Sequence, residues 1–119
     1  MKILIAGAGE VGTHLAKLLG QENHDITLID GDKDRLAIIR DNSDILTYIG
    51  NCTSIKDLTE AGAAHADLYI GVTPEESGNI TSCMLASNLG AKRTLARIDN
   101  YEYLLPKNKE FFEKLGIYS

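Results

Sequence analysis

Short runs of aliphatic residues recur along the chain, and longer stretches with helical spacing separate them. Most of these runs are apolar at successive positions rather than at alternating ones, a pattern typical of parallel strands that are covered on both faces. Strands and helices that alternate with short connections form right-handed crossovers and an open sheet. We therefore predict one α/β domain with a doubly wound, mostly parallel sheet in the strand order 3-2-1-4-5. The predicted strands cover residues 2–6, 25–29, 45–49, 67–72 and 94–98.

Between the predicted strands, apolar residues recur at intervals of three or four, which predicts amphipathic helices with one buried stripe each. In the first helix we expect this stripe to be Val11, Leu15, Leu18 and Leu19. Glycine is favoured just after the last turn of a helix because it adopts left-handed backbone angles without strain. We expect such caps at Gly20, Gly62 and Gly90.

The C-terminal part departs from this regular alternation. A helix is expected over residues 100–105, followed by another that presents Phe111, Phe112 and Leu115 on one face. Residues 116–119 have the pattern of an incoming sixth strand. A length of 119 residues fits one domain, and we expect it to be one lobe of a longer chain.

A glycine-rich hexapeptide joins the first predicted strand to the first helix. Its sequence, Gly7-Ala8-Gly9-Glu10-Val11-Gly12, fits the pattern G-x-G-x-x-G, and Asp30 ends the second strand 18 positions after Gly12. This combination is the fingerprint of a dinucleotide-binding, Rossmann-like fold. The first glycine permits a tight turn, the second lets a pyrophosphate approach the backbone, and the third lets the helix pack on the sheet. Backbone N–H groups and the positive end of the helix dipole would then bind the phosphates.

The acid at the end of the second strand selects among dinucleotides. The Asp30 carboxylate would accept hydrogen bonds from the adenosine ribose hydroxyls and would repel a 2′-phosphate. This favours NAD(H) over NADP(H) as the cofactor. The competing interpretation makes the glycines a structural turn and Asp30 a helix cap or a solvated acid.

Two further loops border the candidate site, because ligands of such sheets lie outside the carboxyl ends of the strands. After the third strand, Cys52 and Thr53 belong to a small polar loop suited to the edge of an adenine. After the fourth strand, Thr73 and Pro74 lie where the ribose or the phosphates would pass. Helix capping is the alternative explanation for these polar residues.

Arg97 is a candidate of a different kind. It falls inside the fifth predicted strand, where a cation is rarely buried without an anionic partner. That partner is expected to be either the phosphate or ribose of the nucleotide or an acid such as Asp99.

Composition excludes several other functions. Twelve Lys and Arg against seventeen Asp and Glu give a formal net charge of −5 without a basic stripe, so nucleic acid is not an expected partner. No apolar run approaches the roughly 20 residues that cross a bilayer, and the first residues lack the layout of a signal peptide. We therefore expect a cytoplasmic protein without direct membrane insertion. The three histidines and two cysteines show neither metal-ligand nor nucleophile spacing, so we predict no metal site, no catalytic residue and no enzyme activity.

Five segments in order resemble the N-terminal lobe of RCK (KTN) domains, the TrkA family of potassium uptake proteins. They are residues 2–12, 28–30, 50–53, 71–73 with Asn79, and 96–98 with Tyr103. Ordinary dehydrogenases share only the first two of these segments. By this resemblance, the nucleotide-binding positions are residues 7–12, Asp30, Thr53, Thr73 and Arg97.

The resemblance also implies a function. It implies a regulatory subunit or domain of a potassium uptake system, in which the nucleotide is a ligand that controls transport and not a reactant. The implied partners are a membrane potassium transporter or channel subunit at the inner face of the cell membrane and further copies of the chain. Dimers or higher oligomers would form through helices at residues 75–90 and 100–105. Glu10 stands where some ATP-binding relatives carry a basic residue, which favours NAD(H) and leaves ATP or ADP as competitors.

A second function is compatible with the glycine-rich hexapeptide alone. The chain would then be the cofactor-binding domain of an NAD-dependent dehydrogenase whose catalytic part lies on another stretch of chain.

Overall fold

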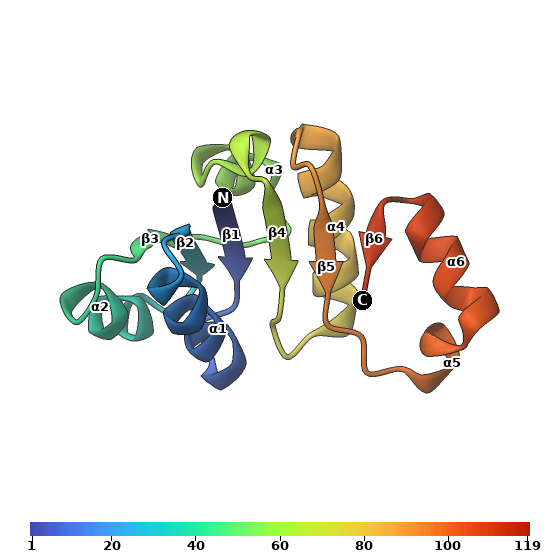
Figure 1. The fold of residues 1–119 in the computed structure, drawn as a ribbon, viewed down its shortest axis with the longest axis horizontal. Coiled ribbons are helices and arrows are strands. Elements are labelled where there is room, and N and C mark those ends of the chain that lie inside the picture. Colours follow the sequence, from blue (N-terminus) through green and yellow to red (C-terminus); the bar gives the residue numbers. More distant parts are fainter.

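Six parallel strands form the central sheet of the structure, a computed structural model that describes residues 1–119 (Figure 1). The strands are β1 Lys2–Ala6, β2 Asp25–Asp30, β3 Leu46–Ile49, β4 Leu68–Gly71, β5 Thr94–Ala96 and β6 Ile117–Tyr118. Their order is β3-β2-β1-β4-β5-β6, and all neighbours are parallel. This confirms the predicted doubly wound sheet, its order and the sixth strand. The strand order reverses between β1 and β4, which makes this position the topological switch point of the sheet.

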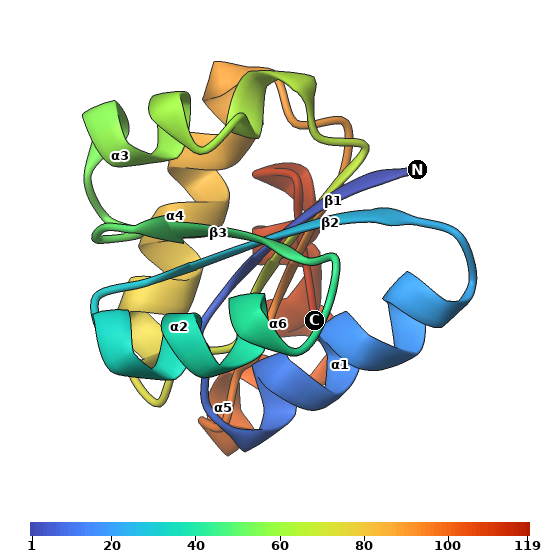
Figure 2. The ribbon, with the colours of Figure 1, turned by 90° about the vertical axis from the view of Figure 1, so that its left-hand side faces the viewer.

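Helices cover both faces of this sheet. They are α1 Glu10–Gln21, α2 Lys33–Asp41, α3 Ile55–Glu60, α4 Glu76–Leu89, α5 Tyr101–Leu104 and α6 Pro106–Lys114, with the 3-10 helix η1 Ala63–His65 after α3. The helices α1 and α2 lie on one face, whereas α3 and α4 lie on the other (Figure 2). The helices α5 and α6 lie beyond β6 at the edge of the sheet (Figure 1). No helix combines the length and the apolar character that a membrane span requires.

The aliphatic strands contribute to two hydrophobic clusters, one on each face of the sheet. Ile3 and Ile5 of β1 belong to the cluster under α1 and α2. Leu4 and Ala6 of the same strand belong to the cluster on the opposite face, together with Leu58 of α3. Successive side chains of a strand point to opposite faces, and both faces of β1 are covered. This explains why the strand is apolar at successive positions.

The predicted stripe of α1 is confirmed in part, because Leu15 and Leu19 pack partly buried against the core and Val11 and Leu18 do not. Val11 and Leu18 are 44% and 46% exposed, whereas Gly12 and Ala16 are buried. The helix lies so close to the sheet that only small residues fit along the line of contact. The larger aliphatic side chains flank this line and are partly covered or exposed.

Two of the three predicted helix caps are confirmed. Gly62 and Gly90 follow α3 and α4 with left-handed φ angles of 94° and 126°. The prediction for Gly20 was wrong, because this residue lies inside α1. The left-handed residue after α1 is Asn23, with a φ of 66°, and asparagine is one of the few other residues that adopt this conformation readily.

The helices α5 and α6 form an arm, residues 101–114, at the edge of the sheet. The rings of Tyr103 and Phe112 pack against each other with centroids 5.2 Å apart. Phe111 and Leu115 are instead 66% and 56% exposed, so the three apolar side chains expected on one face are divided between the helix contact and solvent.

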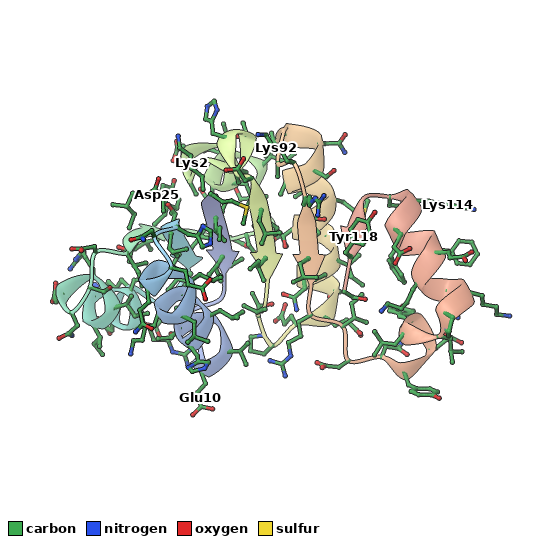
Figure 3. The ribbon with its side chains drawn as sticks, viewed as in Figure 1. Lys2, Glu10, Asp25, Lys92, Lys114 and Tyr118 are labelled. Carbon is green, nitrogen blue, oxygen red and sulfur yellow. The ribbon has the colours of Figure 1, made fainter.

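Asp67, just before β4, connects three segments at the amino ends of the strands. Its Oδ2 accepts a hydrogen bond of 2.8 Å from the backbone N–H of Lys2, and its Oδ1 lies 3.1 Å from the Nζ of Lys92. Figure 3 shows Lys2 and Lys92 at this end of the sheet. The backbone hydrogen bond and the ammonium group stabilise the ionised carboxylate, which lowers the pKa of Asp67 below its usual value of 3.8.

We expect Asp67 to make the folding stability depend on pH. Its carboxylate has a lower pKa in the folded protein, so its contribution is present above the unfolded pKa and is lost as the pH falls through the folded pKa. Urea unfolding between about pH 6 and about pH 2 should therefore show a smaller loss of unfolding free energy in Asp67→Asn than in the wild type. The control Asp44→Asn removes an exposed carboxylate that makes no hydrogen bond or ion pair, and it should follow the wild-type curve. An unchanged curve for Asp67→Asn would contradict this role.

Candidate functional site

A cleft of about 630 Å³ lies at the carboxyl ends of β1 to β4. Its walls are the loops that follow these strands, and its lining residues are Gly7, Ile29, Asp30, Gly31, Ile49, Gly50, Asn51, Cys52, Thr53, Thr73, Pro74, Glu75 and Gly78. The candidates that the structure brings together here are Gly7, Asp30, Cys52, Thr53, Thr73 and Pro74. The folded sheet thus gathers candidates from four loops that are far apart in the sequence.

The other residues of the glycine-rich hexapeptide lie beside this cleft. Ala8, Gly9, Glu10 and Val11 line an adjoining groove of about 890 Å³ between α1 and α2. Glu10 points away from the sheet into solvent (Figure 3). A larger hollow of about 1110 Å³ surrounds the amino ends of β1 and β2. That hollow has no glycine turn and no helix N-terminus that begins at a strand end, so we take the carboxyl-end cleft as the candidate site.

The three glycines of the hexapeptide differ in what a side chain at their position would contact. Gly7 has a φ of 117°, which other residues rarely adopt, and a Cβ there would lie 2.9 Å from the carbonyl oxygen of Val72. A Cβ on Gly12 would lie 1.7 Å from the carbonyl oxygen of Gly7, because α1 packs directly on the turn. A Cβ on Gly9 would meet no atom within 4 Å. The open side of the turn is therefore at Gly9, where the fingerprint predicts that the pyrophosphate approaches.

The Asp30 carboxylate is fixed at the rim of the cleft. Its Oδ2 accepts a hydrogen bond of 2.7 Å from the N–H of Ala8, and its Oδ1 accepts one of 2.7 Å from the N–H of Asp32. The first bond joins the end of β2 to the β1–α1 turn, and the second orders the loop before α2. Asp30 therefore has a structural role, although it is neither the helix cap nor the solvated acid of the competing interpretation, because the cap of α2 is Asp32. Each carboxylate oxygen can accept a further hydrogen bond, so this role is compatible with ribose binding.

The loop after β3 is held by side chains at its start and its end. The Oδ2 of Asp57 in α3 accepts a hydrogen bond of 2.9 Å from the N–H of Asn51. The hydroxyl of Thr53 donates to Asn51 Oδ1 at 2.8 Å, and Ser54 caps α3. Cys52 is partly buried in this loop, and burial raises the pKa of its thiol, which remains neutral near pH 7.

The loop after β4 is held by Asn79 of α4. The side-chain oxygen of Asn79 accepts hydrogen bonds from the N–H and the hydroxyl of Thr73, at 2.9 Å and 2.7 Å. Its amide nitrogen donates to the carbonyl oxygens of Thr73 and Arg97, each at 3.0 Å. The Thr73 hydroxyl is thus occupied within the loop, which leaves its backbone and methyl group as surfaces of the cleft.

The expectation that the Arg97 side chain is buried was wrong. The strand β5 ends at Ala96, one residue earlier, and the Arg97 side chain is 43% exposed. Its Nε lies 3.6 Å from Asp99 Oδ1, which is the acid named as the alternative partner. Arg97 does not line the cleft, so contact between its side chain and a nucleotide remains a prediction.

Seven residues of the lining were not among the predicted site residues: Ile29, Gly31, Ile49, Gly50, Asn51, Glu75 and Gly78. Ile49 is 58% exposed at the end of β3, where it offers an apolar surface. Gly78 and Glu75 enter the cleft from the start of α4. An aliphatic residue at the very end of an edge strand was the available signal for Ile49. No sequence signal indicated that the first turn of α4 borders the cleft.

The charge of the cleft is negative. Its lining includes the carboxylates of Asp30 and Glu75 but no Lys or Arg. Phosphates in this cleft would therefore be bound by backbone N–H groups and the N-terminus of α1, whereas the cationic side chains of Lys17 and Arg35 line the adjoining groove.

The fold and the cleft define a Rossmann-type domain with a glycine-rich turn at its switch point. Residues 3–119 match the family described as the TrkA-N domain, and the chain belongs to this family. The match confirms the resemblance to the N-terminal lobe of RCK domains.

Two curated relatives have names from potassium transport. The Trk system potassium uptake protein TrkA of Haemophilus influenzae is 43% identical over 112 residues, which are 93% of this chain and 24% of that protein. The Trk system potassium uptake protein TrkA homolog of Methanothermobacter thermautotrophicus is 36% identical over 117 residues, which are 98% of this chain and 52% of that protein. The chain thus spans 24% to 52% of the length of these relatives.

Solved structures share the fold at lower identity. The TrkA-N domain of the inner membrane protein ybaL from Escherichia coli has a TM-score of 0.81 at 17% identity, covering 98% of this chain and 82% of that one. The GsuK channel bound to NAD has a TM-score of 0.76 at 18% identity, covering 98% of this chain and 21% of that one. GsuK bound to ADP has a TM-score of 0.75 at 18% identity, covering 98% and 30%.

We expect the substitution Gly12→Ala to destabilise the domain strongly. Alanine favours a helix over glycine by about 1 kcal/mol, so a loss of stability here is attributable to the clash with the Gly7 carbonyl. That clash should lower the free energy of unfolding by at least about 3 kcal/mol in urea titrations. The matched control is Gly9→Ala, because a Cβ at Gly9 meets open space and should leave stability within about 1 kcal/mol of the wild type. Equal stability of the two variants would show that the close contact of α1 with the turn does not exist.

Proposed function

We propose that this domain binds NAD(H) in the carboxyl-end cleft as a regulatory ligand of a potassium transport system. The observation that carries the proposal is the hydrogen bond of 2.7 Å between Asp30 and the Ala8 N–H. This bond fixes the carboxylate that would bind the ribose relative to the turn that would bind the pyrophosphate. An adenine dinucleotide requires both groups in such an arrangement. The open side of the turn at Gly9 leaves room for the phosphates.

The charges of the cleft favour a diphosphate ligand. Asp30 would repel the 2′-phosphate of NADP(H). With Glu75 also in the lining and no cation there, a third phosphate would gain little stabilisation. ADP, which shares the adenosine diphosphate part of NAD, would compete with it, and ATP would bind more weakly. Structures of GsuK with NAD and with ADP are consistent with this choice of ligands.

We infer that the nucleotide acts as a ligand and not as a reactant. The lining offers no pair of a nucleophile and a base, because the Cys52 thiol has a raised pKa and no histidine lines the cleft. Membership of the TrkA-N family supports a regulatory role. A ligand controls such a protein only by binding one arrangement of its parts more tightly than another.

The proposed partners follow from the relatives. Proteins named for potassium uptake match this domain over almost its whole length. We propose that it works at the cytoplasmic face of the membrane, against a potassium transporter or channel subunit, as a homodimer or a higher oligomer. The helices α4 and α5 would supply the contacts between copies.

The role of Asp30 is tested by the preference between NADH and NADPH. The wild type should bind NADH more tightly than NADPH in isothermal titration calorimetry, because the 2′-phosphate meets a fixed carboxylate. The substitution Asp30→Asn removes the charge together with one of the two acceptors for the Ala8 and Asp32 N–H groups, and the loss of charge should reduce this preference by about tenfold. The control Asp34→Asn removes a neighbouring exposed carboxylate outside the cleft and should keep the wild-type preference.

The outcomes separate two claims. If both dinucleotides bind equally well to the wild type, the role assigned to Asp30 is wrong. If neither dinucleotide binds, the proposed function is wrong.

A further inference from the structure

The first turn of α4 contacts the cleft on one side and the end of β5 on the other. Asn79 in this turn is 1% exposed, and its side-chain amide makes four hydrogen bonds. Three of these bonds reach Thr73 in the wall of the cleft, and the fourth reaches the carbonyl oxygen of Arg97 after β5. A buried amide with all of these bonds made holds its partners in one arrangement, because each lost bond would leave a buried polar group unpaired.

Glu76, the first residue of the same turn of α4, extends this connection to the next helix. Its Oε1 accepts hydrogen bonds from the backbone N–H groups of Asp99 and Asn100, at 2.9 Å and 2.6 Å. Asn100 is the N-cap of α5, where its Oδ1 accepts a hydrogen bond of 2.9 Å from the Glu102 N–H. Glu76 therefore fixes the backbone at the point where α5 begins.

The α5–α6 arm packs on the core through the partly buried side chains of Tyr103, Leu104 and Phe112. Neither α5 nor α6 contains a buried residue, and the main packing between them is the contact of Tyr103 with Phe112. Segments with little buried apolar surface open locally at low free energy. The hydrogen bonds from Glu76 should therefore add to the order at the start of the arm, where α5 has no fully buried side chain.

We propose that Asn79 and Glu76 are positioning residues that link the nucleotide cleft to the α5–α6 arm. A ligand that binds only the hydrogen-bonded form of the Thr73 loop suppresses local opening of the same α4 turn, which holds Asp99 and Asn100. By thermodynamic reciprocity, a contact that orders the arm strengthens nucleotide binding by the same factor. This inference rests on the proposed function, because it needs a ligand in the cleft.

Hydrogen–deuterium exchange tests the link in the wild type and in two variants of Glu76, which does not line the cleft. Saturating NADH should slow exchange in peptides that cover residues 99–104 of the wild type by at least about fivefold. The variant Glu76→Ala loses the acceptor for Asp99 and Asn100, so it should bind NADH but lose this protection. The control Glu76→Gln keeps a side-chain oxygen that accepts the same bonds, and it should retain the protection.

Calorimetry on the same samples distinguishes the two ways to fail. If NADH binds and residues 99–104 show no protection in the wild type, or equal protection in Glu76→Ala, the link is overturned while nucleotide binding stands. If the wild type does not bind NADH, the proposed function and the link both fall.

Discussion

The contact between Gly12 and the carbonyl of Gly7 is the constraint on which the carboxyl edge of the sheet depends. It lets α1 begin directly where β1 ends, so that the N-terminus of the helix opens at the switch point. No other residue type fits at Gly12, because its Cβ would come within 1.7 Å of the Gly7 oxygen. The close approach of α1 to the sheet, with Gly12 and Ala16 as its buried residues, accompanies this contact.

Hydrogen bonds of one kind then fix three loops around that switch point. In each of three loops a side-chain oxygen accepts a backbone N–H: Asp30 from Ala8, Asp57 from Asn51, and Asn79 from Thr73. These acceptors come from the end of β2, from α3 and from α4. The regular elements around the cleft therefore hold the loops that form its walls. A cleft whose walls are already hydrogen-bonded loses little conformational entropy on binding, which is how preorganisation increases affinity.

Much of this architecture was predictable, because buried parallel strands and the glycine fingerprint leave strong local patterns. The strand order, the turn at residues 7–12 and Asp30 came from such patterns. The exposure of Arg97 and of the α1 side chains could not be predicted in this way. The exposure of Arg97 depends on where β5 ends, and that of the α1 side chains depends on how closely the helix packs on the sheet. The four hydrogen bonds of Asn79 join residues up to 18 positions apart, and no local pattern reports such contacts.

The central claim is that the two linked phosphates of a dinucleotide bind at the turn between β1 and α1. Backbone amide chemical shifts during a titration with NADH test it most directly. The account predicts saturable changes that are largest at residues 7–12 and extend to Asp30 and Thr73. Changes that centre on the hollow at the amino ends of the strands, around Asp25 and Asp44, would contradict it.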